Sequence, residues 1–161
     1  MTTTPFPSAK TSCRRSCCAR PLPWPTRRAA PYRSRARDLD PLEKDLLDHS
    51  AVERLSVEDI KKGSAAVDGQ MKRLSSLADI IYVHVDMDVL DPPEVAGHPL
   101  TVPGGPTSLE LAAALTAMFR YEKAAAFGVA STPSGDADRD GRSRQAAYNL
   151  ILGALEGVKR R

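Results

Sequence analysis

The first 37 residues contain no Asp or Glu, and the chain has no run of about eighteen apolar residues that could cross a membrane. A membrane protein is therefore not predicted. Nine of the 23 Lys and Arg residues lie before Asp38, whereas 14 basic residues face 20 acidic ones from Asp38 onward. Such an abrupt change in charge indicates two segments of different kinds.

Residues 1–36 form a basic, Pro- and Arg-rich segment without helical or strand periodicity, and we predict that they are disordered. All three cysteines lie here, at Cys13, Cys17 and Cys18. A zinc site would need four donors at fixed spacing, and no histidine is near them, so zinc is not predicted. Two other interpretations stay open: an organellar transit peptide, or GC-rich DNA read in the wrong frame. Nucleic-acid binding is disfavoured, because the segment lacks interleaved aromatic residues.

The remainder, residues 37–161, alternates between helical and strand patterns. Apolar spacing and a capping-box arrangement at Ser56 and Asp59 predict helices over 39–48 and 56–76, with a brief strand at Val52–Leu55 between them. The β-branched run Ile80–Val85 predicts a central strand buried on both faces.

A turn-rich loop follows, and then Thr107 and Glu110 form a second capping box that predicts a helix. Residues 124–131 read as another buried strand, and a last helix runs through Leu155. Alternating strands and helices predict an α/β fold, a three-layer α/β/α arrangement around a parallel sheet. The strands near Val52, Ile80 and Ala124 should be parallel.

Two carboxylates, Asp86 and Asp88, follow the predicted central strand with one residue between them. Ligands bind at the carboxyl ends of strands in open parallel sheets, because the loops there vary while the strands hold them rigidly. Two carboxylates in a low-dielectric site repel each other unless a cation lies between them. Oxygen donors favour Mn, Mg or Ca, and an added histidine would favour Mn, Zn or Fe.

Three motifs resemble the arginase/agmatinase (ureohydrolase) family. The run His84–Pro92, followed by glycines at 97, 104 and 105, resembles its signature, in which Ser-x-Asp-x-Asp precedes Leu-Asp-Pro and a Gly-rich loop. Arg37–Glu43 resembles the family's Arg-Asp-x-Asp-Pro-x-Glu, and Gly105–Glu110 its Gly-Gly-x-Thr-x-x-Glu. The motifs occur in the family's order. Asp91 and the loop glycines are interpreted as residues that set backbone geometry.

The resemblance implies an arginase-like fold, of which residues 37–161 would be the C-terminal part, truncated at its N-terminal side. It implies hydrolysis of a guanidino or amidino C–N bond with release of urea, by water activated between two manganese ions. Asp86 and Asp88 match the last two metal ligands of the family. A small guanidino substrate and a cytoplasmic location are also implied, and a homo-oligomer is left open.

The departures from the family pattern matter as well. Its four other metal ligands belong to a first half that this sequence does not match, and nothing before Arg37 replaces them. His49 lies at a predicted helix end far from any carboxylate pair, and His84 and His98 lack the family spacing, so all three are interpreted as surface or loop residues rather than ligands. Ala130–Pro133 stands where arginases carry Glu-x-Asn-Pro, which argues against arginine as the substrate. We therefore expect an incomplete or inactive hydrolase. The alternative is a non-catalytic subunit that acts through protein contacts.

Overall fold

The structure, a computed structural model, describes residues 40–161 except 63 and 96. The predicted disordered segment, residues 1–36, lies outside the described residues. The elements follow one another in the order α1 (Pro41–Asp48), α2 (Val57–Lys62), α3 (Ser64–Leu77), β1 (Ile81–Asp86), η1 (Met87–Val89), η2 (Pro92–Glu94), α4 (Ser108–Met118), β2 (Ala124–Ala130), η3 (Gly135–Asp138) and α5 (Arg142–Lys159), where η marks a short 3₁₀ helix.

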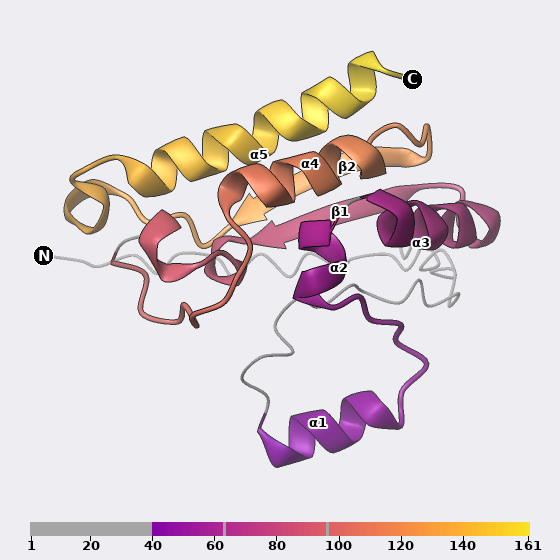
Figure 1. The fold of residues 1–161 in the computed structure, drawn as a ribbon, viewed down its shortest axis with the longest axis horizontal. Helices are drawn as coiled ribbons and strands as arrows, with labels where there is room; N and C mark the ends of the chain where they lie inside the picture. Colours follow the sequence, from indigo (N-terminus) through magenta and orange to yellow (C-terminus); the bar gives the residue numbers. More distant parts are fainter. Residues whose placement is uncertain (1–39, 63, 96) are drawn as a thin grey trace, which may run out of the picture.

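Helix α1 forms as predicted and stands apart from the helices beside the sheet (Figure 1). Asp40 caps it, because its side chain accepts a hydrogen bond from the Glu43 amide at 2.8 Å. Leu47 is buried, whereas Leu42 and Leu46 are exposed.

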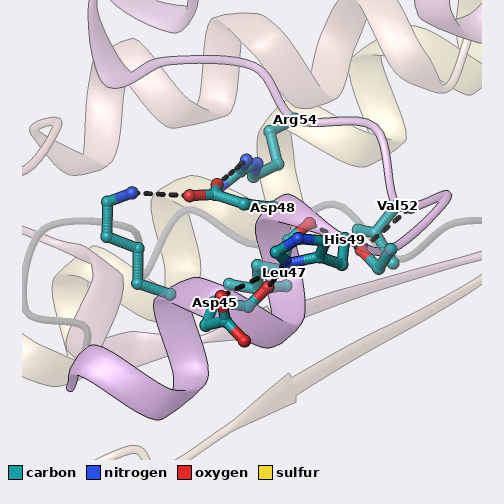
Figure 2. A network of polar contacts seen from close by, with 8 residues as sticks. Asp45, Leu47, Asp48, His49, Val52 and Arg54 are labelled. Atoms are coloured by element: carbon teal, nitrogen blue, oxygen red, sulfur yellow. Dashed lines mark hydrogen bonds and ion pairs between the residues drawn. The ribbon is translucent and has the colours of Figure 1, made fainter.

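The strand predicted at Val52–Leu55 is wrong, since these residues form no regular structure. Figure 2 shows the polar contacts that fix this segment against the end of α1. The Val52 amide donates to Ser50 Oγ at 3.2 Å, and the Arg54 guanidinium lies 2.7 Å from Asp48 Oδ1. Lys44 contacts the other oxygen of Asp48. Local side-chain partners thus take the place of a neighbouring strand.

The long helix predicted after Ser56 is divided into α2 and α3, with residue 63 between them outside the described residues. The capping box forms: the Asp59 amide donates to Ser56 Oγ at 3.1 Å, and the Ser56 amide donates to Asp59 Oδ2 at 3.0 Å. Ile60, Val67 and Met71 are at most 3% exposed, so the predicted apolar stripe faces the core.

Strands β1 and β2 pair in parallel, as predicted for these two strands. Their register places Val83 beside Phe127 and Val85 beside Val129. Helix α4 connects the end of β1 to the start of β2 and begins with the predicted capping box at Thr107 and Glu110. A strand–helix–strand connection is the arrangement that joins neighbouring parallel strands.

Helices α2 to α5 share one hydrophobic core with Ile81 and Val85 of β1. Leu115 of α4 and Leu150 of α5 are fully buried in it. The rings of Phe119 and Phe127 meet edge to face at 5.6 Å between centroids. The described residues thus form the parallel sheet and the layer of helices on one of its faces.

Among the described residues the opposite face of β1 is open, so the prediction of a strand buried on both faces is wrong. Tyr82 is 59% exposed, and His84 is exposed beside it. The Tyr82 hydroxyl lies 2.9 Å from His84 Nδ1 and close above Gly128 of β2. Burial therefore alternates along the strand, because described helices cover only the face that carries Ile81 and Val85.

Helices α4 and α5 lie side by side (Figure 1). They approach each other closely at two glycines of α5. A Cβ on Gly153 would lie 2.4 Å from the Ala112 carbonyl oxygen, and one on Gly157 would lie 2.5 Å from that of Thr116. The Thr116 hydroxyl donates to the Gly153 carbonyl at 2.9 Å. Among the described helices, none has the length and apolar character to span a bilayer.

Candidate metal site

Asp86 and Asp88 lie where β1 ends and the chain turns into η1. Asp86 is the last residue of the strand, with extended backbone, and Asp88 lies within the 3₁₀ turn. Met87 between them is fully buried in the core. The position of both carboxylates at the carboxyl end of a parallel strand agrees with the sequence-based prediction.

Both carboxylates are shielded from solvent. Asp88 is 5% exposed, and Asp86 is partly buried. Asp86 Oδ1 is buried and has no hydrogen-bond partner among the described residues. A buried carboxylate oxygen without a donor is costly, and a bound cation would offset that cost.

His98 joins this pair, although the sequence did not indicate it. Asp86, Asp88 and His98 each offer a donor atom within 4.8 Å of the other two. This is the one such group of metal-ligating side chains in the described part of the chain. The sequence pattern predicts a loop histidine without the family's ligand spacing; His98 does lie in a loop, and the fold brings that loop to the two carboxylates.

Backbone geometry brings His98 to the site. Gly97 has φ +82°, a left-handed conformation that favours glycine. A Cβ there would lie 2.6 Å from the Ala137 carbonyl oxygen, so the loop after β2 packs directly against this turn. The His98 amide donates to the Val95 carbonyl at 3.1 Å, and Val95 is buried in the core.

The loop after β2 is held by Asp138, whose carboxylate accepts hydrogen bonds from the amides of Ser143 and Arg144 at 2.8 and 3.1 Å. Burial by itself would raise the pKa of Asp138, but these donors outweigh it and hold the pKa below its ordinary value. The ionised Asp138 thus fixes the start of α5 and the loop that supports Gly97.

Asp91 organises the glycine-rich loop, as the sequence suggested. Its Oδ1 accepts hydrogen bonds from the amides of Gly104 and Gly105 at 2.6 and 3.1 Å. Gly104 has φ +89°, and a Cβ on Gly105 would lie 2.6 Å from the Val89 carbonyl oxygen. These residues therefore serve backbone geometry.

The other two histidines lie outside the group formed by Asp86, Asp88 and His98. His84 contacts Tyr82 on the open sheet face, and His49 Nδ1 contacts the Asp45 carbonyl in α1 at 2.8 Å. Ala130, in contrast, pairs in register with Asp86 across the sheet. The residue matched in sequence to the arginase glutamate is thus a neighbour of Asp86 in the sheet.

Among models of known protein families, that of the arginase family matches residues 32–155 of this chain. The chain belongs to the arginase family. The resemblance seen in the sequence motifs and the predicted arginase-like α/β fold with a parallel sheet are both confirmed. No curated protein matched the sequence.

Several solved structures resemble this chain. Formimidoylglutamase from Bacillus subtilis has 25% identity and a TM-score of 0.67 over 77% of this chain. Arginase from Bacillus cereus has 25% identity and a TM-score of 0.64 over 76% of it. Proclavaminate amidino hydrolase from Streptomyces clavuligerus has 25% identity and a TM-score of 0.57 over 78%. The matches cover 39%, 42% and 40% of those chains, so this chain spans about two fifths of their length.

Proposed function

We propose that this chain carries part of the metal centre of an arginase-family hydrolase, which cleaves a C–N bond of a small guanidino or amidino compound and releases urea. Asp86 and Asp88 are the proposed metal ligands, and manganese is the proposed metal. When bound, manganese would activate a water molecule for attack on the guanidino carbon. The observation that carries the proposal is the buried Asp86 Oδ1 without a partner, beside Asp88 at the end of a parallel strand.

Neighbouring residues of this chain hold and orient the two proposed metal ligands. The sheet fixes the Asp86 backbone, because β1 and β2 pair through to Asp86 and Ala130. Met87 is fully buried in the core and so anchors the turn that carries Asp88, which is itself 5% exposed. Asp91 holds the following loop by accepting hydrogen bonds from the amides of Gly104 and Gly105, and it is not one of the proposed metal ligands. Rigid support of this kind places ligands to within a fraction of an ångström.

The substrate is proposed to be a small guanidino or amidino compound other than arginine. The names of the three similar structures indicate enzymes that act on different compounds within the family. Ala130 beside Asp86 supplies no carboxylate for a charge-assisted contact with a guanidinium. A substrate held by other contacts is therefore favoured.

We further propose that this chain by itself has no appreciable activity. Two carboxylates give only part of the coordination that two manganese ions require, so metal affinity should be weak. Orientation of the substrate is impaired as well, because Ala130 offers no charged contact. We also propose a cytoplasmic location. Self-association is proposed through the edges of the sheet, which has two strands among the described residues.

A second candidate function is that of a non-catalytic subunit that acts through protein contacts. The open sheet face favours it, since Tyr82 is 59% exposed there and Ile80, just before β1, is 69% exposed. Large exposed apolar side chains on a sheet face mark a surface that a partner can cover.

Manganese titration of the full chain separates these functions. We expect the wild-type chain to bind Mn²⁺ weakly. The Asp86→Asn variant should lose binding, because the side chain with the buried, unpartnered oxygen then carries no negative charge. Asp136→Asn serves as a matched control, since that side chain is 93% exposed and pairs with Arg139. Absence of Mn²⁺ binding by the wild-type chain would favour the non-catalytic subunit and refute the metal centre.

Activity is tested by urea release from arginine, agmatine and related guanidino compounds with excess Mn²⁺. We expect no turnover above background from this chain. Turnover that disappears in Asp86→Ala would show the chain to be a working enzyme and contradict the proposed inactivity.

A further inference from the structure

We propose that His98 is a third metal donor, which makes the site selective for transition-metal dications such as Mn²⁺, Co²⁺ and Zn²⁺ over Mg²⁺ and Ca²⁺. The inference rests on the proposed metal site at Asp86 and Asp88 and adds a residue that the family motifs do not predict. It follows from the approach of donor atoms of all three side chains to within 4.8 Å of one another.

The chemistry of the donors sets the selectivity. Carboxylate oxygens are hard donors and suit Mg²⁺ and Ca²⁺ as well as Mn²⁺. An imidazole nitrogen shifts the preference toward Mn²⁺, Zn²⁺ and Fe²⁺, because Mg²⁺ and Ca²⁺ bind nitrogen poorly. His98 would thus convert a pair of oxygen donors into a site that discriminates between these two classes of cation.

The surroundings of His98 suit such a role. The ring is partly buried, and its backbone is fixed by the Val95 carbonyl and by the close packing of Gly97 against Ala137. The Thr101 hydroxyl donates to the His98 carbonyl at 3.2 Å. A metal ligand works best when its backbone is held in this way.

Metal binding by His98 would break the hydrogen bond that its ring accepts from the Leu100 amide. The Leu100 amide donates to His98 Nδ1 at 3.2 Å, so the neutral ring carries its proton on Nε2. If Nδ1 binds the metal, its lone pair is no longer available to Leu100. If Nε2 binds the metal, the proton moves to Nδ1, which then cannot accept. Coordination by either nitrogen therefore excludes the Leu100 hydrogen bond.

This exclusivity gives a direct readout that does not depend on activity. Titration of the isotopically labelled full chain with Zn²⁺, followed by NMR, should shift the Leu100 amide resonance and speed its hydrogen exchange. Titration with Mg²⁺ should leave both unchanged. A Leu100 amide that keeps its hydrogen bond when Zn²⁺ is bound would overturn the role of His98.

Cation affinities of variants supply the second test. Removal of groups that merely support a ligand weakens metal binding by 10- to 100-fold, so His98→Ala should lower Co²⁺ and Mn²⁺ affinity by at least about tenfold. The same variant should bind Mg²⁺ as the wild-type chain does. His98→Gln, which keeps a side chain of similar length, should behave like His98→Ala, and the visible absorption of bound Co²⁺ should change in both.

His49→Ala is the matched control, since His49 lies in α1 and contacts Asp45. Its Co²⁺ affinity and spectrum should equal those of the wild-type chain. If His98→Ala binds Co²⁺ as tightly as the wild-type chain while Asp86→Asn loses binding, the role of His98 is wrong and the metal site at the aspartates stands. If Asp86→Asn retains full affinity, the proposed function itself fails at its metal site.

Discussion

Replacement of Gly153 by alanine should loosen the contact between α4 and α5. The new methyl carbon would lie 2.4 Å from the Ala112 carbonyl oxygen and 2.8 Å from the Ala112 Cα and Cβ atoms. Two of these three atoms belong to the backbone of α4, so no side-chain rotation relieves the clash. The two helices must move apart, which also stretches the hydrogen bond from the Thr116 hydroxyl to the Gly153 carbonyl.

The magnitude follows from a comparison with Gly69 in α3, where an added Cβ meets no atom within 4 Å. Both substitutions raise helix propensity by about 0.8–1 kcal/mol, so Gly69→Ala should stabilise the protein by about that amount. Gly153→Ala carries in addition an overpacking cost of about 1–3 kcal/mol. The difference between the two variants isolates the packing cost, because their propensity gains are equal.

Urea unfolding of the full chain, followed by circular dichroism at helix wavelengths, measures both free energies. The two variants should differ by about 1–3 kcal/mol, which corresponds to about 4 °C in melting temperature for each kcal/mol in a domain of this size. Equal stabilisation by both substitutions would refute the reasoning, because α5 could then not be in close contact with α4 at Gly153.

The remaining predictions concern α4 and the loop that precedes it. Thr107→Ala removes the acceptor of the Glu110 amide and should destabilise the chain by about 1 kcal/mol in urea unfolding. The backbone hydrogen bond from Thr107 holds the pKa of Glu110 below its ordinary value of 4.5. The ionised Glu110 therefore contributes its full stability above pH 4.5, and this contribution is lost as the pH falls through the lower pKa of the folded state. In urea unfolding measured across pH, Glu110→Gln should reduce the loss of stability at acid pH. An unchanged loss in this variant would contradict the role of Glu110. Asp91→Ala leaves the Gly104 and Gly105 amides without their acceptor and should cost about 1–3 kcal/mol, whereas Asp91→Asn, which keeps an oxygen, should cost less in the same assay.

The sequence by itself determined the features that depend on neighbouring residues. The capping boxes at Ser56 and Thr107 formed as predicted, because each needs only residues three positions apart. The position of Asp86 and Asp88 at a strand end followed from the β-branched run before them. The family motifs identified the fold, since they keep their order along residues matched by the family model.

Tertiary structure alone decided which faces are covered and which distant residues meet. The pattern at Val52–Leu55 suited a strand, but a strand needs a neighbour, and this segment bonds instead to the end of α1. The apolar run of β1 suited burial on both faces, yet described helices pack on one face only, and Tyr82 stays exposed.

His98 shows most clearly what local sequence patterns do not predict. It lies ten residues after Asp88, and no local pattern gives the path of the chain between them. Its approach to the carboxylates depends on the left-handed turn at Gly97, and that turn packs against Ala137 in the loop that follows the second strand. Contacts between segments far apart in sequence are set by the packing of the whole domain, whereas sequence periodicity reports only on the local backbone.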